Sequence, residues 1–309
     1  MSSGERGQRV LVVGASGQVG TQVLRILPSG SAIPTSRRAE KPGWTALDLA
    51  TVSEAEANEL DRRYEIAAIY CIGGMTHVDG CESTPELARR INCEGPAILA
   101  AAAAERGARF VYFSTDYVFN GQNGPYAEDV PGDPIDAYGR SKWLGELAVQ
   151  DAHPAALVIR TTTVYGPDPN GKNFLYSLRK GLAGTKPFRV PADQISTPTY
   201  NLDLAAAVVA LAQSDAQGVF HVAGPDVVSR LEFARRAAAV MGLDPANLSG
   251  VSTAELAQIA ARPLQGGLLT GKLAAQLPEV RMRGIEDGVS HWVGTDEFNK
   301  ASAVVRKLG

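Results

Sequence analysis

The sequence predicts an α/β fold: a doubly wound parallel sheet with a smaller C-terminal substrate lobe. Two observations in the 309 residues support it. Short apolar runs alternate with helical patterns through the first half, and this alternation loosens after residue 163. Strand and helix that alternate repeatedly are typical of parallel sheets, whose strands are buried on both faces.

The expected elements follow from the period of the apolar residues. Runs without a helical period predict strands at 9–13, near 33, and at 44–49, 66–72 and 110–114, and a later strand near 218–224 that rejoins the sheet. Helical patterns predict helices up to residue 27 and at 53–63, 85–104, 173–182, 229–241 and 253–261.

A glycine-rich turn follows the first strand. The segment Gly14-Ala15-Ser16-Gly17-Gln18-Val19-Gly20 opens a helix. Glycine lets the backbone approach a pyrophosphate, which the free N–H groups at a helix start attract. Any tight strand-to-helix turn also needs glycine, so the pattern alone leaves a structural reading open. In context it predicts a Rossmann-type NAD(P)-binding domain over 1–162, which uses Gly14, Ser16, Gly17, Gln18 and Val19, and a substrate-binding lobe over 163–309.

Ligands of such sheets bind beyond the carboxyl ends of the strands. The residues expected there are Asp48, Leu49, Cys71, Ile72 and Gly73. Asp48 can accept a hydrogen bond from the adenine amino group, or it can cap its own loop.

Two arginines stand where an NAD enzyme usually carries a carboxylate, about twenty residues beyond the glycines. Arg37 and Arg38 would pair with a 2′-phosphate, which a carboxylate would repel. The sequence therefore favours NADPH over NADH, although a solvated basic turn is the plain alternative.

Three polar residues form the candidate catalytic group. Tyr138 and Lys142 are spaced i, i+4, so on a helix they share one face. A nearby ammonium is expected to lower the phenol pKa and make Tyr138 a better acid. Thr115 follows the strand at 110–114, and its hydroxyl can polarise a substrate carbonyl. The pattern predicts a carbonyl reductase.

Charge and composition exclude several other classes of protein. With 30 basic and 33 acidic residues the net charge is -3, which favours neither nucleic acid nor an anionic membrane as a partner. The opening segment 1–8 is polar, so we expect a cytoplasmic protein. Cys71, Cys81 and Cys93 have no metal-like spacing, and we expect reduced thiols and no metal site.

These motifs together resemble the extended short-chain dehydrogenases/reductases, and among them the dTDP-4-dehydrorhamnose reductase family. The resemblance runs nearly end to end. It rests on the segments 14–20, 114–121 and 138–142, and on Arg160 followed by Val164-Tyr165-Gly166. It implies that Thr115, Tyr138 and Lys142 are catalytic, and it points to substrate contacts by Asp116, Tyr117, Val118, Tyr165, Asn173, Gln194 and Arg262. Asn173 and Gln194 would meet sugar hydroxyls, and Arg262 would meet a diphosphate or form a salt bridge.

The chain departs from the family at two positions that bear on the substrate. Cys71-Ile72-Gly73-Gly74 replaces the usual Asn-Ala-Ala, and Thr163 stands where relatives often carry tryptophan. Losing an indole removes a large flat apolar surface, so either the sugar differs or another side chain fills the space.

The resemblance implies NADPH-dependent reduction of the C4 ketone of a nucleotide-linked 4-keto-6-deoxy sugar, by a possible homodimer. One alternative is a non-catalytic NADP-binding regulatory subunit, like the methionine adenosyltransferase beta subunit. Another is a different sugar-nucleotide enzyme, such as a 4,6-dehydratase or 4-epimerase. Dehydration normally needs an Asp-Glu pair after the threonine, whereas Tyr117 follows Asp116 here.

Overall fold

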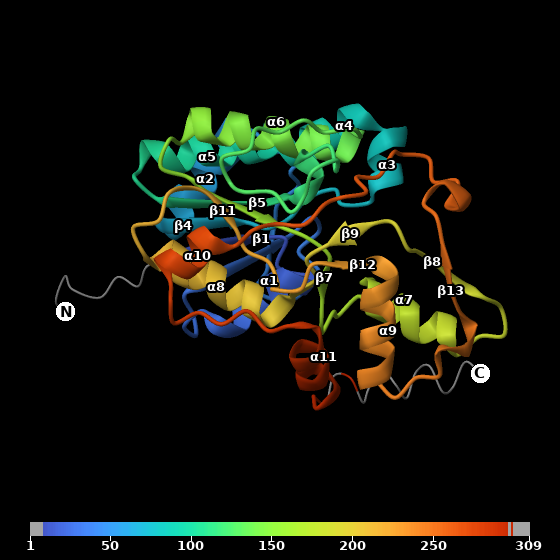
Figure 1. Cartoon of the computed structure of the whole chain (residues 1–309). Coiled ribbons are helices and arrows are strands. Elements are labelled where there is room, and N and C mark those ends of the chain that lie inside the picture. Colours follow the sequence, from blue (N-terminus) through green and yellow to red (C-terminus); the bar gives the residue numbers. More distant parts are fainter. Residues whose placement is uncertain (1–8, 296–297, 299–309) are drawn as a thin grey trace.

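The computed structural model describes residues 9–295 and Phe298, so the polar opening segment and both outer domain limits lie outside the described residues (Figure 1). Seven parallel strands form the central sheet in the order β11-β6-β5-β4-β1-β2-β3. The predicted doubly wound α/β fold is confirmed. The strands are β1 (Arg9–Val13), β2 (Ala32–Ser36), β3 (Thr45–Ala46), β4 (Ile66–Cys71), β5 (Arg109–Thr115), β6 (Leu157–Thr161) and β11 (Gly218–His221).

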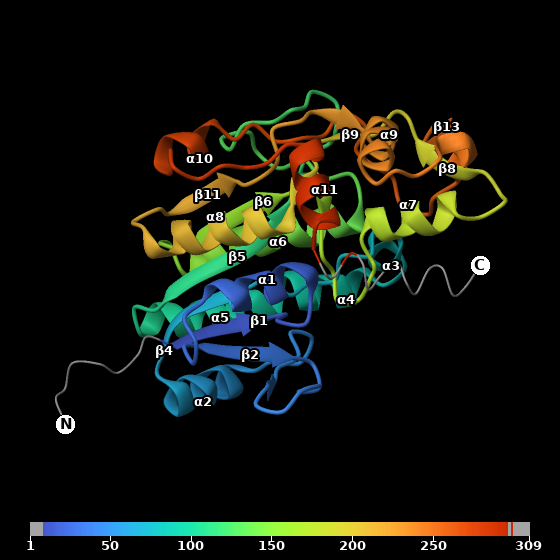
Figure 2. The same ribbon diagram turned by 90° about the horizontal axis from the view of Figure 1, so that it is seen from below.

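Alternate residues of each strand bury against opposite helical layers, as the period of two requires. Val10 and Val12 of β1 belong to one apolar cluster, and Leu11 and Val13 to the other. Helices α5 and α6 lie above the sheet in Figure 1, and α1 and α8 lie below it and pack together (Figure 2). The helices of the two layers are α1 (Gln18–Ile26) and α8 (Asn201–Gln213), and α2 (Glu54–Tyr64), α5 (Gly95–Glu105) and α6 (Ala137–Ala152).

The helix expected at 85–104 is interrupted. It begins as α4 (Pro85–Arg89), after the short α3 (Val78–Ser83), and loosens into a π-helical turn over Arg90–Glu94 before α5. Such turns occur frequently at functional sites.

A second lobe packs around three helices at the lower right of Figure 1: α7 (Phe174–Leu182), α9 (Arg230–Val240) and α11 (Ile285–Val293). Its short strands pair in separate two-stranded sheets. These pairs are β7 (Val164–Tyr165) with β10 (Thr199–Tyr200), β9 (Ile195–Ser196) with β12 (Val228–Ser229), and β8 (Phe188–Pro191) with β13 (Leu248–Val251).

The chain then returns from the second lobe to the central sheet. β11 joins the central sheet beside β6, and α10 (Gly271–Gln276) contacts β11. The helix expected at 253–261 does not form. Only a 3-10 turn at Ala254–Leu256 is present, and Ala257 ends it in the left-handed region with a φ of 48°. Among the described residues, no helix has the length and apolar character needed to cross a bilayer.

Asp136 caps α6, the helix that carries Tyr138. Its carboxylate accepts a hydrogen bond from the Gly139 N–H at 2.9 Å, and its side chain is 1% exposed. Burial, assisted by the nearby Glu82, raises the pKa of Asp136 to about 6, despite the opposing hydrogen bonds and the Arg262 charge. The start of this helix is therefore held by an acid that resists ionisation.

This raised pKa predicts a pH dependence of stability. Between pH 4 and pH 6 the folded state holds the Asp136 proton more firmly than the unfolded state, so stability should fall as pH rises through that window. Asp136→Asn keeps the cap and cannot ionise. We expect the free energy of unfolding of the parent, relative to that of this variant, to fall by about 3 kcal/mol at most between pH 4 and pH 6.5.

Urea unfolding at a series of pH values measures this difference. Asp129→Asn, at an exposed aspartate, controls for simple loss of charge. Parallel pH profiles for the parent and Asp136→Asn would contradict the raised pKa.

Candidate active site

The glycine turn brings the ends of β1 and β4 into close contact. Gly14 has a φ of 83°, and a Cβ there would lie 2.6 Å from the backbone nitrogen of Gly73. The Gly17 N–H donates to the Gly14 carbonyl at 3.1 Å. Only glycine fits this close approach, and the result is a cradle of backbone groups at the start of α1.

The second lobe closes over this turn through amide side chains. Asn170 donates to the Ser16 carbonyl at 2.9 Å, and Asn173 donates to the Gln18 amide oxygen at 3.2 Å. The oxygen of Asn173 accepts from the Leu175 N–H and so caps α7. Asn173, predicted to meet a sugar hydroxyl, therefore lies beside the glycine turn and is bonded within the protein. Val19 packs in the core.

Arg37 and Arg38 follow β2, which pairs in parallel with β1, so they lie at the same sheet edge as the glycine turn. The Ala15 N–H donates to the Thr35 carbonyl at 3.1 Å, which joins the two turns. Both arginines are exposed. Within the described part of the chain, neither guanidinium forms a hydrogen bond or an ion pair, so both remain available to an anion.

Most side chains predicted along the neighbouring strand ends pack or cap. Asp48 accepts from the Ala50 N–H at 3.0 Å, which is the loop-capping alternative. Leu49 and Cys71 are buried in the core, and burial raises the pKa of the Cys71 thiol to about 12. The Ile72 N–H donates to the Val13 carbonyl at 3.1 Å, which holds this segment against β1.

Thr115, Tyr138 and Lys142 lie together at the carboxyl edge of the sheet, and all three are buried. Thr115 ends β5, and its hydroxyl accepts from the Tyr117 N–H at 3.3 Å and hydrogen-bonds to Tyr138. Tyr138 and Lys142 lie on the buried face of α6, as their spacing predicted. A proton donor and a polarising hydroxyl are thus adjacent, with a cation one helical turn away.

The electrostatics of Tyr138 differ from the prediction. Burial raises its pKa, and the main opposing contribution is the hydrogen bond with Thr115, not the ammonium of Lys142. Lys142 instead faces the Tyr112 ring, 4.2 Å from its centroid, and burial lowers its own pKa to about 8. Tyr138 and Lys142 share a helix face, but desolvation shifts the pKa of each group more than the charge of the other group does.

Asn92 is a site residue that the sequence did not single out. It sits in the π-helical turn, fully buried, and exchanges hydrogen bonds with the Met75 backbone at 2.8 and 2.9 Å. It also donates to the Ser141 hydroxyl at 2.9 Å, and Ser141 in turn donates to the Tyr138 carbonyl. The available signal was its spacing, because Asn92 stands four residues from each of the apolar residues Ala88 and Pro96.

A buried ion pair lies behind the same helix. Arg160 of β6 binds the Glu146 carboxylate through its Nε at 3.0 Å and its Nη2 at 2.7 Å. Ser114 donates to the same carboxylate. Burial and the Arg160 charge lower the pKa of the adjacent His221 to about 3, which keeps that imidazole neutral.

The predicted substrate residues separate into two groups. Asp116 and Tyr117 border the candidate catalytic side chains: the Tyr117 ring lies 5.5 Å from that of Tyr138, and Thr115, Thr162 and the Gly267 N–H hydrogen-bond to Asp116. Val118 and Tyr165 instead lie fully buried in apolar clusters, so the structure gives these two a packing role.

Two further predicted contacts are occupied within the protein. Gln194 donates to the Thr253 hydroxyl at 3.0 Å. Arg262 forms an ion pair with Asp79 at 2.8 Å and donates to the Ala260 carbonyl at 2.9 Å, which is the salt-bridge alternative. The sequence did not single out Arg230, whose charge acts on Asp116 and Tyr117.

Thr163, which stands where relatives often carry tryptophan, has a φ of 44°. This conformation is unusual for a β-branched residue. Its hydroxyl donates to the Ser196 hydroxyl at 3.0 Å, which joins the segment after β6 to β9.

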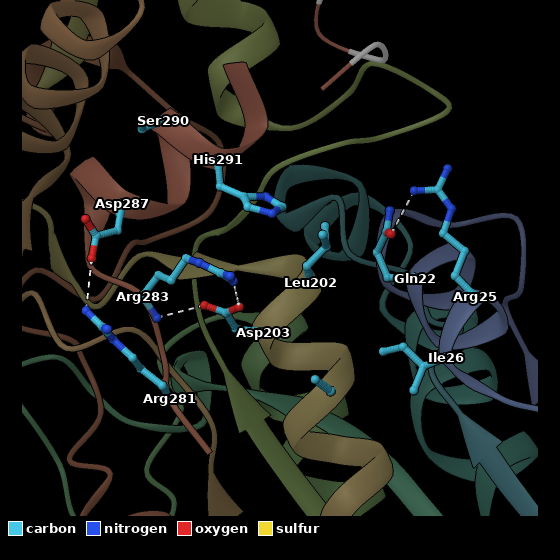
Figure 3. Close-up of a pocket in the computed structure, with 11 residues that line it drawn as sticks. Gln22, Arg25, Ile26, Leu202, Asp203, Arg281, Arg283, Asp287, Ser290 and His291 are labelled. Carbon is cyan, nitrogen blue, oxygen red and sulfur yellow. Dashed lines mark hydrogen bonds and ion pairs between the residues drawn. The ribbon is translucent and has the colours of Figure 1, made fainter. Parts of the chain in front are cut away.

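A cavity of about 740 Å³ lies elsewhere, between α1, α8 and α11 (Figure 3). None of the predicted site residues lines it. Its charged side chains are paired with partners, as in the Arg281–Asp287 and Arg283–Asp203 ion pairs and the His291–Tyr200 hydrogen bond. This cavity is therefore separate from the candidate chemistry.

Known proteins match this chain along nearly its whole length. The family model described as the RmlD substrate binding domain matches residues 8–294. A dTDP-4-dehydrorhamnose reductase of Mycobacterium tuberculosis is 37% identical over 268 residues, which cover 83% of each chain. A dTDP-4-keto-6-deoxy-D-glucose reductase of Streptomyces niveus is 32% identical over 82% of this chain and 86% of its own length.

Solved structures agree with the sequence matches. The crystal structure of a Bacillus anthracis dTDP-4-dehydrorhamnose reductase in complex with NADP has a TM-score of 0.83 at 30% identity, and the match covers 92% of this chain and 98% of that one. The chain therefore belongs to the RmlD family of extended short-chain dehydrogenases/reductases, the family of the dTDP-4-dehydrorhamnose reductases.

Proposed function

We propose that this chain catalyses the NADPH-dependent reduction of the C4 ketone of a dTDP-linked 4-keto-6-deoxy sugar. The observation that carries the proposal is the convergence of Thr115, Tyr138 and Lys142 beside the glycine turn. The named activities of the M. tuberculosis and S. niveus relatives support this substrate class.

The residues at the sheet edge fit NADPH. The Gly14 turn leaves room for a pyrophosphate where any Cβ would collide with Gly73. Arg37 and Arg38 present two unpaired guanidinium groups to a 2′-phosphate, and the NADP complex of the B. anthracis relative supports that cofactor. When bound, NADPH supplies the hydride that converts the carbonyl carbon into a carbinol carbon.

The protein supplies the proton and the polarisation. Because burial raises its pKa, Tyr138 keeps its proton at neutral pH and can pass it to the substrate oxygen as negative charge develops there. Thr115 donates a hydrogen bond to the same oxygen. Lys142, whose pKa is lowered to about 8, is still mostly protonated at pH 7 and stabilises the phenolate that Tyr138 becomes. One hydride at carbon and one proton at oxygen give the alcohol.

The surroundings of the site favour net reduction. Asp116 is followed by Tyr117, so no second carboxyl is supplied there for elimination.

We also propose a cytoplasmic location, which fits a consumer of NADPH. A homodimer fits the exposed leucines of α6, Leu144 and Leu147, which are 38% and 46% exposed.

Tyr138→Phe removes the proton donor and leaves the ring. We expect kcat to fall by about a hundredfold or more, while the Kd for NADPH changes little. Absorbance loss at the nicotinamide band with a panel of dTDP-4-keto sugars measures turnover. Tyr64→Phe, a tyrosine of α2 whose hydroxyl bonds Thr45, serves as the control. Full activity in Tyr138→Phe would refute its role, and an inactive parent would favour the regulatory alternative.

The double change Arg37→Ala/Arg38→Ala removes the charges assigned to the 2′-phosphate. We expect NADPH affinity to fall by about 10- to 100-fold, because charge-assisted hydrogen bonds are lost, while NADH affinity stays constant. Fluorescence titration with both cofactors measures the preference. Arg62→Ala/Arg63→Ala, an adjacent exposed pair on α2, is the matched control. An unchanged preference for NADPH would contradict the assignment.

A further inference from the structure

The loop at residues 166–172, between β7 and α7, lies against the glycine turn of the first domain. The Asn170 side chain donates a hydrogen bond from its Nδ2 to the Ser16 carbonyl oxygen at 2.9 Å. The two residues are 154 positions apart in the sequence, and Asn170 is exposed. One surface side chain of the second lobe therefore reaches the backbone of the turn to which the cofactor pyrophosphate is assigned.

Asp168 gives this loop a fixed shape. Its carboxylate accepts from the Asn170 N–H at 2.9 Å and from the Lys172 N–H at 2.8 Å, and its carbonyl oxygen accepts from the Gly171 N–H at 3.0 Å. The Asp168 N–H in turn donates to the Tyr176 hydroxyl of α7 at 3.2 Å. The Asn170 side chain is thus presented by a loop that its own hydrogen bonds hold in place.

The peptide unit between Ser16 and Gly17 is held at both of its polar atoms. A peptide unit is planar, so its C=O and its N–H turn together. Asn170 binds the carbonyl oxygen, and the Gly17 N–H donates to the Gly14 carbonyl at 3.1 Å. Without the Asn170 side chain this peptide unit would lose one of these two bonds and could rotate more freely.

The same peptide unit directly precedes the first turn of α1. Gly17 is the N-cap residue of this helix, and it provides no side-chain cap. The first N–H groups of a helix lack partners within the helix and attract anions. When the turn before them is fixed, these donors stay aimed in one direction, and an anion binds without first having to order them.

Two other asparagines of the second lobe bind the residue that begins α1. Asn173 donates to the Gln18 amide oxygen at 3.2 Å, and Asn201 donates to the Gln18 carbonyl at 3.4 Å. Asn173 also caps α7, and Asn201 also donates to the Pro167 carbonyl at 2.7 Å, so a change at either would disturb the second lobe itself. Asn170 is exposed, so the contact with the turn can be removed there without opening a core.

We propose that Asn170 is a positioning residue for the cofactor: by binding the Ser16 carbonyl, it holds the glycine turn in the form that receives the pyrophosphate. This rests on the proposed function, which assigns NADPH to that turn. NADPH and NADH share the pyrophosphate, whereas only NADPH carries the 2′-phosphate assigned to Arg37 and Arg38. A loosened turn therefore weakens both cofactors by the same factor and leaves the preference between them unchanged.

Asn170→Ala removes the donor from the full-length chain. We expect the affinities for NADPH and NADH, measured by fluorescence titration, each to fall about 3- to 10-fold, the range of one modest hydrogen bond. In the chain without cofactor, the Gly17 amide should exchange its hydrogen faster than in the parent, because the peptide unit is less restrained. Asn170→Asp has nearly the same shape but cannot donate, and its charge repels phosphate, so it should bind both cofactors more weakly still.

Asn247→Ala is the matched control. Asn247 is also an asparagine of the second lobe whose side chain donates to a backbone carbonyl, that of Gly184. This variant should bind both cofactors as the parent does and should leave the exchange of the Gly17 amide unchanged.

The outcomes separate this inference from the proposed function. Unchanged cofactor affinities in Asn170→Ala, or a loss confined to NADPH, would overturn the role of Asn170 alone. Weaker binding without faster exchange at Gly17 would overturn it too, because the turn would then not be what had changed. A parent that binds both cofactors but reduces no dTDP-4-keto sugar would contradict the proposed substrate and not the role of Asn170. A parent that binds neither cofactor would contradict both proposals.

Discussion

The buried carboxylate of Glu146 holds together the two elements that carry the candidate catalytic side chains. It lies on α6, one turn beyond Lys142, and it receives hydrogen bonds from Ser114 of β5 and from Arg160 of β6. Breaking such a buried pair by removing one partner typically costs about 3–5 kcal/mol. Because Ser114 directly precedes Thr115, this one carboxylate sets the spacing between Thr115 on the strand and Tyr138 on the helix.

Desolvation then decides how the groups in front of that carboxylate behave. Burial keeps Tyr138 protonated, and it makes Lys142 easier to deprotonate than an exposed lysine. In a dry crevice each charge acts more strongly on its neighbours than it would in water. The second lobe contributes to this through Asn173 beside the glycine turn and through the charge of Arg230, which acts on Tyr117. The crevice is thus built from both halves of the chain.

Local patterns in the sequence predicted what depends on neighbours along the chain. Six of the seven strands of the central sheet followed from short apolar runs, whereas β6 (Leu157–Thr161) was not predicted; the turn followed from Gly14 and Gly17, and the shared helix face from the spacing of Tyr138 and Lys142. The helix expected at 253–261 failed, because a short polar and alanine-rich segment does not reveal that the chain turns at residue 257.

Features that depend on distant partners could not be predicted in the same way. Arg262 meets Asp79 across 183 positions of sequence, and no local pattern reveals that pairing. Tyr165 lies in a family motif yet is enclosed by the core of the second lobe. The raised pKa of Tyr138 depends on burial by several elements, whereas the sequence offered only its separation from Lys142.

The central claim is that these groups act on a carbonyl whose carbon receives hydride directly from the nicotinamide. Isotope transfer tests it most directly. The parent chain would be incubated with NADPH deuterated at the transferring position and with a dTDP-4-keto-6-deoxy sugar, and the product would be examined by mass spectrometry and NMR. The account predicts one deuterium at C4 of the product sugar. A product that carries no deuterium at C4, or the absence of any reduced sugar, would contradict it.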